Sequence, residues 1–511
     1  MIGLRELFRT ARVIPQAIHG DLEIRALTSN SRAIRPGDAF VCMPSARTDS
    51  HNFLAAAHAN GAVAAIVHSE EGFKTAQSLG LAVALINPRT TSPSETLEGQ
   101  IRAQMGGFTD ALWRLADVAF GSPSAQLDVI GITGTNGKTT TAWLVRDALN
   151  QLGVAAGYLG TLGVDGPGLP LRELANTTPF SLELNAILAE QVSLGTRALA
   201  MEVSSHALSE SRVGGIKFAV ATFTNLTQDH LDYHGSMEAY AAAKHTLFTD
   251  YHPRAIALNI DDETGRLWSE GKPEAWTFAR SRTHNPRVWA EDVKVSIDHV
   301  SMKLCEDGER ESSVEAHLGG DYNASNLLAA AATLRAGGYG PLHRIADALS
   351  EARPVPGRFE PVVNDSGIGI IVDYAHTPDA LEKLLNAARP LTTGRILTVF
   401  GCGGDRDRAK RPLMAAAAAA GSDALYVTSD NPRTEDPESI LRDIEAGIPV
   451  DCEHVVEVDR PRAVQAAILA AQPGDTVIIA GKGHENYQII GHEKQPMDDR
   501  KLARAGLEMR S

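Results

Sequence analysis

Cysteine is scarce in this sequence. Its 511 residues include 4 cysteines, and no two of them form a Cys-x-x-Cys pair. Widely separated single cysteines exclude a zinc ribbon and a disulfide framework, because both need paired thiols at short spacing. We therefore expect reduced thiols at all four positions, which are Cys42, Cys305, Cys402 and Cys452.

A long hydrophobic run is also missing. A membrane-spanning helix needs about 18 consecutive apolar residues, and every apolar stretch here is broken sooner by glycine, proline or charge. The amino-terminal segment MIGLRELFRTARVIPQ lacks the apolar centre of a secretory signal peptide. The sequence therefore predicts no insertion into a membrane, and we expect a soluble, cytoplasmic protein that acts as a monomer.

Basic residues are fewer than acidic residues in this sequence. Lysine and arginine number 48 against 63 aspartates and glutamates, a net charge of −15 at pH 7. This balance argues against general nucleic-acid binding, which needs basic surfaces to neutralise phosphates. An anionic small substrate stays possible, because a few well-placed arginines and backbone N–H groups can hold one on an acidic protein.

Apolar residues, by contrast, are plentiful enough to fill several cores. The hydrophobic fraction is 43% and the charged fraction 22%, which excludes a mainly disordered or fibrous chain. At roughly 100–200 residues per domain, the length favours three domains. Linker-like segments at 121–126 and 354–357 predict the divisions 1–122, 123–353 and 354–511.

The predicted fold class is α/β in all three regions. Short apolar runs alternate with helical patterns, which predicts parallel sheets covered on both faces. Residues 286–318 alternate apolar and polar, which indicates a small antiparallel excursion. The strand-like runs end in turns rich in Gly, Asp, Asn or His, where ligands gather in open α/β sheets. The main predicted strands are 38–43, 62–67, 128–133, 198–203, 218–223, 255–259, 370–373, 395–400, 424–428 and 475–480.

A glycine-rich turn lies between the predicted strand 128–133 and a helical pattern over 139–152. It reads Gly134-Thr-Asn-Gly-Lys138-Thr139. The backbone N–H groups of such a turn and the helix dipole form a cradle for phosphate. Lys138 can reach the β- and γ-phosphates of a nucleotide, and the Thr139 hydroxyl can bind Mg²⁺. The usual first glycine would stand at Ile132, so this loop is shorter than the common form.

Several longer segments resemble the Mur ligase family, the ATP-dependent amide-forming enzymes of peptidoglycan precursor synthesis. They are GTNGKTTT, MEVSSHAL, TNLTQDHLDYHG, YAAAKHTLF, GDYNASNLLAA, PGRFE and DYAHTPDAL, in the family's order along nearly the whole chain. The segments TSNSRAIRPGDAFV, GDRDRAKRPLM, SDNPRTEDP and AGKGHENYQ are similar to the branch that adds meso-2,6-diaminopimelate to UDP-N-acetylmuramoyl-L-alanyl-D-glutamate. The resemblance implies a small N-terminal UDP-binding domain, a central P-loop ATPase and a C-terminal Rossmann-like domain.

The implied reaction places two anions in contact. ATP phosphorylates the D-Glu side-chain carboxylate, and an amine then attacks the acyl phosphate. Two unit charges 4 Å apart repel by ~4 kcal/mol at an effective dielectric constant of 20, so cations must offset this repulsion. The resemblance implies catalytic roles for Lys138, His230 and Lys244. It implies Mg²⁺ binding by Thr139, Glu202, His230 and Lys244.

Lys244 carries two competing interpretations. It lies in a helical pattern, Ala241-Ala-Ala-Lys-His-Thr-Leu-Phe, where a lysine is ordinarily a solvated surface residue. The resemblance instead implies a carbamylated lysine, N6-carboxylysine. Carbamylation replaces a cation by an anionic oxygen ligand of the kind that Mg²⁺ prefers.

The resemblance also implies the nucleotide and UDP-substrate contacts. The implied ATP-binding residues are Gly134, Thr135, Asn136, Gly137, Lys138, Thr139, Thr140, Asn323, Arg358 and Asp373, with Asn326 beside Asn323 and Tyr322 where the family usually has Phe. The implied UDP-substrate residues are Ser29, Ser31, Ala46, Arg47 and Thr48 for the UDP part, and Asn176, Thr177, Thr178, Ser204 and Arg212 for the peptide part. Glu210 stands where relatives often have Gln.

The amino-acid donor is implied by one short segment. Asp430-Asn-Pro-Arg433 matches the diaminopimelate-adding branch, and lysine-adding relatives lack that arginine. Two carboxylates and an ammonium call for arginine donors and a carboxylate acceptor. The implied donor-binding residues are Arg406, Asp430, Asn431, Pro432, Arg433, Gly481 and Glu485.

Three alternatives stay open at this stage. A related ligase could add L-lysine or another diamino acid, and Arg433 argues against it. A small-molecule kinase would stop after phosphoryl transfer, and a C-terminal domain with an amine pocket disfavours it. A nucleotide-switched regulatory protein would hydrolyse ATP without any amino acid.

Overall fold

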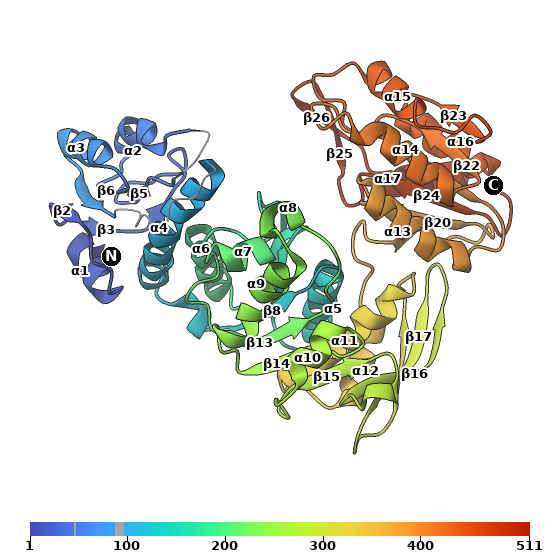
Figure 1. Cartoon of the computed structure of the whole chain (residues 1–511), viewed down its shortest axis with the longest axis horizontal. Helices are drawn as coiled ribbons and strands as arrows, with labels where there is room; N and C mark the ends of the chain where they lie inside the picture. Colours follow the sequence, from blue (N-terminus) through green and yellow to red (C-terminus); the bar gives the residue numbers. More distant parts are fainter. Residues whose placement is uncertain (45–47, 87–96, 511) are drawn as a thin grey trace. The chain divides into compact units, whose positions relative to one another are not determined.

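The computed structural model describes residues 1–44, 48–86 and 97–510, with the backbone alone for 97–106. The chain divides into two compact units, and Figure 1 labels their elements. The first unit combines Met1–Ala142 with Gly153–Trp276, and the second combines Trp143–Leu152 with the residues from Thr277 onward. The α/β fold class is confirmed. The division into 1–122, 123–353 and 354–511 stays a prediction.

The first unit begins with a five-stranded sheet in the order β2-β7-β6-β5-β4. Strands β4 to β7 run parallel and β2 is antiparallel. Side chains alternate between two buried clusters, so one face packs on α1 and α4 and the other on α2 and α3. The elements are β1 (Ile2–Gly3), α1 (Leu4–Thr10), β2 (Ala17–His19), β3 (Glu23–Ile24), β4 (Leu27–Thr28), β5 (Ala39–Val41), η1 (Ser50–Phe53), α2 (Leu54–Ala59), β6 (Ala64–Val67), α3 (Glu70–Ser78), β7 (Ala82–Leu85) and α4 (Leu97–Ala119).

Seven further strands of the first unit lie side by side in the order β11-β10-β9-β12-β8-β13-β14. Strands β9, β12, β8, β13 and β14 are parallel, whereas β10 and β11 form an antiparallel hairpin that the sequence did not predict. The elements are η2 (Pro123–Ala125), β8 (Asp128–Thr133), α5 (Lys138–Gln151), β9 (Ala156–Gly160), β10 (Gly163–Gly166), β11 (Leu169–Arg172), α6 (Ser181–Ser193), β12 (Ala198–Glu202), α7 (Ser205–Ser209), β13 (Phe218–Phe223), α8 (Leu231–His234), α9 (Met237–Thr249), β14 (Ala255–Asn259) and α10 (Glu263–Ser269).

The second unit starts with the antiparallel excursion predicted from residues 286–318. Strands β16, β17 and β18 pair antiparallel, and β15 pairs parallel with β16. Alternating burial along β18 matches the alternating sequence. The elements are β15 (Trp276–Ala279), η3 (Arg282–His284), β16 (Val288–Val295), β17 (Val300–Glu306), β18 (Ser312–Ala316), α11 (Tyr322–Ala336) and α12 (Leu342–Ser350).

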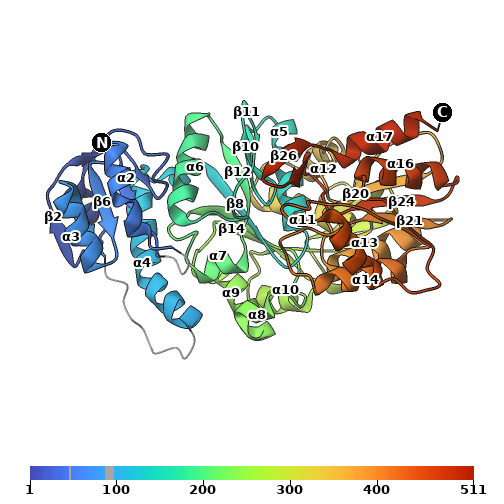
Figure 2. The ribbon, with the colours of Figure 1, turned by 90° about the horizontal axis from the view of Figure 1, so that it is seen from above.

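The C-terminal part of the second unit is doubly wound. Its sheet has the order β19-β20-β24-β21-β22-β23, parallel except for β19. One face packs on α13, α14 and α15 and the other on α16 and α17, as Figure 2 shows for four of these helices. The elements are β19 (Glu360–Pro361), β20 (Gly369–Asp373), α13 (Pro378–Ala388), η4 (Arg389–Leu391), β21 (Ile396–Phe400), α14 (Lys410–Gly421), β22 (Ala424–Val427), α15 (Pro437–Glu445), β23 (His454–Val456), α16 (Arg460–Ala470), β24 (Thr476–Ala480), β25 (Tyr487–Ile490), β26 (Glu493–Pro496) and α17 (Asp499–Glu508).

Helices that are both long and apolar enough to cross a membrane are absent from the part of the chain that the structure describes. The two longest helices there, α4 and α11, have 23 and 15 residues. Both pack on the protein's own sheets, which accounts for their apolar faces.

A buried ion pair fixes the two helices on one face of the C-terminal sheet. Arg460 opens α16 and Asp499 opens α17, and both side chains are 0% exposed. The guanidinium donates to the carboxylate at 2.8 and 2.7 Å and to the Ala480 carbonyl at 3.0 Å. A buried carboxylate that loses its partner has no water to replace it.

We therefore predict that Arg460→Met lowers the free energy of unfolding by about 3–5 kcal/mol. The matched control is Arg442→Met on α15, because Arg442 is 65% exposed and its pairing with Asp436 spans 3.5 Å. The control should lose no more than about 1 kcal/mol. Urea unfolding of both variants measures the difference, and equal losses would contradict the role given to the buried pair.

Candidate active site

The glycine-rich turn lies between β8 and α5, as predicted, and a close contact or a positive φ favours glycine at both of its glycine positions. Gly134 has φ +152°, and a Cβ there would lie 1.9 Å from the Thr224 hydroxyl. Gly137 has φ 84°, in the left-handed region that favours glycine. The Thr224 hydroxyl donates to the Asn136 carbonyl at 2.6 Å, so the segment after β13 supports the turn.

Residues 224–227 hold the turn at further points that the sequence did not reveal. The Asn136 amide donates to Asn225 Oδ1 at 2.9 Å, and the Thr135 hydroxyl donates to the Thr227 carbonyl at 3.1 Å. Strand β13 pairs with β8, which brings the two loops to the same sheet edge. The Thr-Asn-Leu-Thr segment directly follows β13, a parallel neighbour of β8, and this position is the sequence feature that indicates contact with the turn.

Two lysine amino groups converge on one carbonyl of this turn. Lys138 Nζ donates to the carbonyls of Gly134 and Thr135 at 3.0 and 2.8 Å. Lys244 Nζ, from α9, donates to the Gly134 carbonyl at 2.8 Å. The Lys244 side chain is 1% exposed and lies over the Tyr240 ring at 4.3 Å. The interpretation of Lys244 as a solvated surface lysine is therefore wrong.

Burial changes the chemistry of Lys244. Its pKa lies well below the ordinary lysine value, first because the amino group is desolvated and second because Lys138 is close. A lowered pKa favours the neutral amine, which is the form that reacts with CO₂ to give a carbamate. The environment of Lys244 is thus suited to carbamylation, which would also remove one of two neighbouring positive charges.

Glu202 ends β12 and is 1% exposed. Its Oε1 accepts hydrogen bonds from the Tyr158 hydroxyl at 2.6 Å and the Thr161 amide at 2.8 Å, and its Oε2 accepts from the Thr161 hydroxyl at 3.3 Å. The strand register sets Glu202 opposite Ile132 of β8, two residues before the glycine-rich turn. A carboxylate oriented in this way at the strand end can bind a hard cation.

His230 belongs to a cluster of aromatic rings beside the turn. It has φ 52°, and its Nε2 lies 3.5 Å from Asp229 Oδ2. Its ring centroid is 4.8 Å from that of His206, which in turn lies 4.0 Å from that of Tyr233. Burial and the neighbouring His230 lower the pKa of His206. Nothing in the sequence pattern singled out His206.

The possible metal ligands around the turn fit Mg²⁺ if Lys244 is carbamylated. The Thr139 hydroxyl, the Glu202 carboxylate and the His230 imidazole are ligand types that this cation accepts. As an ammonium, however, Lys244 would repel a cation here, whereas its carbamate would contribute oxygen. The residues therefore fit the implied metal when Lys244 is carbamylated.

The residues implied for the peptide part of the substrate gather around the end of β12. The Thr178 hydroxyl donates to the Glu202 carbonyl at 2.8 Å, the Ser204 amide donates to Thr178 Oγ1 at 3.1 Å, and Arg212 donates to the Thr178 carbonyl at 3.0 Å. The Thr177 hydroxyl lies 3.1 Å from that of Thr161.

Glu210, the residue that departs from the family pattern, pairs with Arg212 at 2.7 Å and accepts from the Tyr233 hydroxyl at 3.2 Å. This pairing offsets the charge of Arg212 in the structure. Asn176 is half-buried on the turn before α6.

The residues implied for the UDP part are described only in part. Ser29 and Ser31 follow β4, and the Asn60 side chain donates to the Ser31 carbonyl at 2.9 Å. Thr48 lies exposed just before η1. Ala46 and Arg47 lie outside the described residues.

The remaining nucleotide residues lie in the second unit. Asn323 and Asn326 are buried on α11 and joined by a hydrogen bond of 2.8 Å. Asp373 accepts hydrogen bonds from the amides of Phe359 and Ala375 at 2.7 and 2.8 Å. Burial raises the pKa of Asp373, against the opposing charge of Arg358. Tyr322 meets Phe359 edge-to-face, with ring centroids 5.8 Å apart.

The residues implied for the amino-acid donor occupy three turns that follow β21, β22 and β24. These strands are parallel neighbours, so the turns lie at one edge of the sheet. Arg433 donates to the Gly404 carbonyl at 2.7 Å, which joins the first turn to the second. The Asn431 side-chain amide donates to Glu485 Oε2 at 2.9 Å, which joins the second to the third. Arg406 and Asp430 lie in the first and second turns, and Gly481 opens the third.

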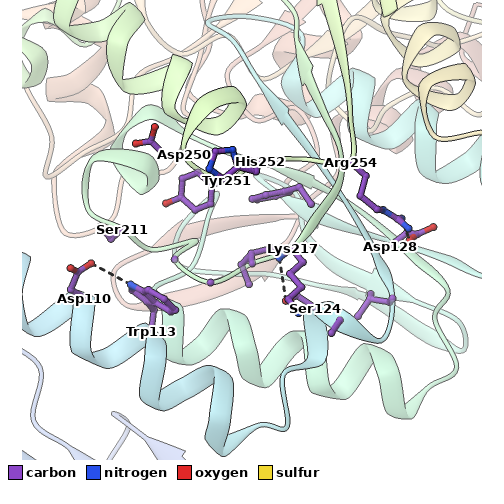
Figure 3. A pocket seen from close by; sticks show the side chains of 16 residues that line it. Asp110, Trp113, Ser124, Asp128, Ser211, Lys217, Asp250, Tyr251, His252 and Arg254 are labelled. Carbon is purple, nitrogen blue, oxygen red and sulfur yellow. Dashed lines mark hydrogen bonds and ion pairs between the residues drawn. The ribbon is translucent and has the colours of Figure 1, made fainter. Parts of the chain in front are cut away.

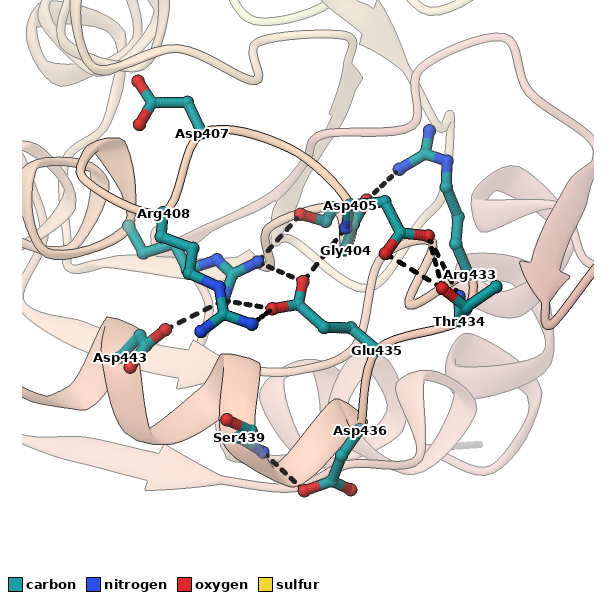
Figure 4. A network of polar contacts seen from close by, with 12 residues as sticks. Gly404, Asp405, Asp407, Arg408, Arg433, Thr434, Glu435, Asp436, Ser439 and Asp443 are labelled. Carbon is teal, nitrogen blue, oxygen red and sulfur yellow. Dashed lines mark hydrogen bonds and ion pairs between the residues drawn. The ribbon is translucent and has the colours of Figure 1, made fainter.

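A charge network ties the turn of Arg406 to the turn of Arg433 (Figure 4). Arg411 is 0% exposed and donates to Glu435 at 2.6 Å and to Asp443 at 2.8 Å. The Asp405 amide donates to Glu435 Oε2 at 3.0 Å, and the Thr434 hydroxyl donates back to Asp405 at 2.9 Å. The network therefore fixes the spacing between the two arginine-bearing turns, a function that the sequence pattern did not reveal.

A cavity of about 730 Å³ lies elsewhere in the first unit (Figure 3). It is bordered by the first residues of β8 and β13, at the sheet edge opposite to the glycine-rich turn. The Trp113 ring packs on Gly214 and Gly215, where an added Cβ would lie 2.3 and 2.6 Å from it. None of the predicted site residues that the structure describes lines this cavity.

Comparison with known proteins identifies the family of this chain. The sequence pattern of the Mur ligase middle domain matches residues 132–334, and that of the Mur ligase glutamate ligase domain matches residues 357–483. The chain belongs to the Mur ligase family.

Within that family, the chain is similar to proteins named UDP-N-acetylmuramoyl-L-alanyl-D-glutamate--2,6-diaminopimelate ligase. That of Thermosynechococcus vestitus is 44% identical over 100% of this chain and 98% of its own length, and that of Geobacillus kaustophilus is 41% identical over 96% of each. A solved structure of a ligase of this name has a TM-score of 0.64 at 32% identity, covering 95% of both chains. A MurF ligase from Thermotoga maritima in complex with ADP shares the fold, with a TM-score of 0.58 at 18% identity.

The network around Glu435 generates a pH prediction. Hydrogen bonds from Arg411 lower the pKa of Glu435 to about 2 from its ordinary 4.5. A lowered pKa stabilises the folded protein above pH 4.5, and this stabilisation is lost as the pH falls toward 2. We expect Glu435→Gln to lower the melting temperature at pH 7, and the difference from the unmodified protein to shrink between pH 4.5 and 2.

Thermal unfolding at a series of pH values measures this difference. Glu438→Gln on α15 is the control, because the Glu438 side chain is 72% exposed. A gap between Glu435→Gln and the unmodified protein that stays constant down to pH 2 would argue against the Arg411–Glu435 pairing.

Proposed function

We propose that this protein is an ATP-dependent ligase that adds meso-2,6-diaminopimelate to UDP-N-acetylmuramoyl-L-alanyl-D-glutamate, in peptidoglycan precursor synthesis. Full-length similarity to ligases of that name supports the activity. The observation that carries the choice of donor is Arg433, which is held on the Gly404 carbonyl in the turn that Asn431 joins to Glu485. The rival donor, L-lysine, has no second carboxylate for that guanidinium.

The first step transfers the γ-phosphate of ATP to the D-Glu side-chain carboxylate, giving ADP and an acyl phosphate. The N–H groups of residues 134–140 and the Lys138 ammonium are suited to hold the phosphates. Lys138 must leave the loop carbonyls that it contacts in the structure to do so. Mg²⁺ bound by Thr139, Glu202, His230 and the carbamate of Lys244 would supply charge that offsets the repulsion between the two anions.

The second step forms the amide bond. The donor's reacting amine attacks the acyl carbon as the free base, phosphate leaves, and the amine's proton is released. In this proposal Arg433 and Arg406 would bind the carboxylates, and Glu485 the ammonium that does not react. Holding that distant end leaves the reacting amine free for attack, which raises its effective concentration at the acyl phosphate.

We also infer a cytoplasmic location, a monomeric state and the three domains 1–122, 123–353 and 354–511. All four cysteines are free thiols in the structure, which suits a reducing compartment. A monomer is supported by the chain's own supply of residues for the nucleotide, the UDP-substrate and the amino acid.

Donor choice is the first test. We predict that kcat/KM of the unmodified protein is much higher for meso-diaminopimelate than for L-lysine. Arg433→Ala should lower kcat/KM for meso-diaminopimelate by roughly 10- to 150-fold, and the variant should not use L-lysine efficiently. A charge-assisted hydrogen bond contributes ~1.5–3 kcal/mol, and each ~1.4 kcal/mol is a tenfold change. Product mass with ATP, the UDP-dipeptide and each amino acid gives the measurement.

Arg442→Ala is the matched control, because Arg442 is an exposed arginine of the same unit outside the donor pocket. It should retain normal kinetics with both donors. Equal kcat/KM values for the two donors in the unmodified protein would refute the diaminopimelate assignment and favour the broader class of diamino-acid ligases.

Lys244 provides the second test. We expect Lys244→Ala to lower ligation roughly 100-fold or more, because the carbamate oxygens that would help to hold Mg²⁺ beside the phosphates are lost. Added acetate or formate should restore part of the activity by occupying the place of the carbamate. Lys74→Ala, at an exposed position of α3, is the control. Full activity of Lys244→Ala would show that no carbamate is needed.

A further inference from the structure

Lys482 is a buried lysine in the third of the turns implied for donor binding, and the proposed mechanism gives this lysine no role. It lies in the turn Gly481-Lys482-Gly483-His484-Glu485 after β24, and its side chain is 0% exposed. An ammonium without water is stable only when it is paired and hydrogen-bonded. The hydrogen-bond partners of Lys482 therefore indicate its role.

Both partners are residues implied for donor binding. Lys482 Nζ donates to Glu485 Oε2 at 2.9 Å and to Asn431 Oδ1 at 3.1 Å. The Asn431 side-chain amide donates to the same Glu485 Oε2 at 2.9 Å. The Ile489 backbone amide, from β25, donates to Asn431 Oδ1 at 2.8 Å. Lys482, Asn431 and Glu485 thus form a closed triangle anchored on the β25–β26 hairpin.

The two carboxylate oxygens of Glu485 differ in their hydrogen-bond partners. Its Oε2 accepts from both Lys482 and Asn431. No group in the described residues donates a hydrogen bond to its Oε1, and the side chain is 17% exposed. The carboxylate is therefore held by one oxygen and keeps the other as an acceptor.

We propose that Lys482 is a positioning residue that fixes Glu485, so that its second oxygen receives the non-reacting ammonium of the amino-acid donor. This inference rests on the proposed function. Lys482 is too buried to touch the donor, so it acts through Glu485. Without Lys482, the Glu485 carboxylate keeps only Asn431 as a hydrogen-bond donor and is free to rotate, so its second oxygen is no longer held for the ammonium of the amino-acid donor.

The test compares two amino acids that differ only in the group concerned. Aminopimelate in its L form keeps both carboxylates of meso-diaminopimelate but lacks the second amino group. In Lys482→Met we expect the KM for meso-diaminopimelate to rise about tenfold, equivalent to ~1.4 kcal/mol. For aminopimelate, the KM as a substrate or the Ki as an inhibitor should change by less than about twofold. The KM values for ATP and the UDP-dipeptide should be equally insensitive.

A double-variant cycle tests whether the effect runs through Glu485. In a Glu485→Gln background, Lys482→Met should cause no further rise in the KM for meso-diaminopimelate. Lys482→Gln keeps one hydrogen-bond donor and should give an intermediate KM. This second variant also covers the case in which Lys482→Met does not fold, which its thermal unfolding curve reveals.

The outcomes distinguish a failure of the proposed function from a failure of the positioning role of Lys482. An unmodified protein that does not use meso-diaminopimelate refutes the proposed function, and the inference with it. An unmodified protein that uses it, with Lys482→Met raising the constants of both amino acids equally, refutes the positioning role alone and leaves Lys482 as a structural residue. Additive rises in the KM for meso-diaminopimelate in the double variant would also refute the positioning role alone.

Discussion

Parallel strand pairing is the constraint on which this structure depends. Parallel strands deliver their carboxyl ends to the same sheet edge, and the residues proposed to act on phosphate and on the donor stand directly after such strands. In the first unit, β8, β12 and β13 place the glycine-rich turn, Glu202 and the supporting segment 224–227 at one edge. In the second unit, β21, β22 and β24 do the same for the donor-binding turns. Residues distant in sequence become neighbours without long loops.

Charge compensation then decides which arrangements at those edges are stable. Arg411 and Lys482 are fully buried cations, and each is paired with a glutamate. Lys244 has no carboxylate partner among the described residues and shares a backbone carbonyl with Lys138. Burial and the nearby Lys138 lower the pKa of Lys244 well below the ordinary lysine value, and the proposed carbamate would replace two neighbouring positive charges by a pair of opposite sign.

The sequence predicted the sheets well and the polar networks poorly, for physical reasons. Strands buried on both faces are continuous apolar runs, so β8, β13 and β24 were found at or within one residue of their observed ends. The sequence does not predict the β25–β26 hairpin, because β26 is exposed along its length and has no apolar pattern. The pairing of Arg411 with Glu435 spans 24 residues and that of Lys244 with Gly134 spans 110, so local patterns could not reveal either.

The β25–β26 hairpin contacts the turn that carries Asn431 and Arg433, two of the residues proposed to bind the donor. Arg433 has φ 53°, a left-handed conformation that a residue with a Cβ adopts at a cost of about 1–2 kcal/mol. Its amide donates to the Ile489 carbonyl at 3.0 Å and its carbonyl accepts from the Gly491 amide at 2.7 Å, which hold this conformation. The Ile489 amide also supports Asn431, and through it Glu485. The backbone of β25 therefore supports both Arg433 and Glu485, the residues proposed to bind a carboxylate and an ammonium of the donor. If both roles hold, a donor lacking either group loses one of these contacts.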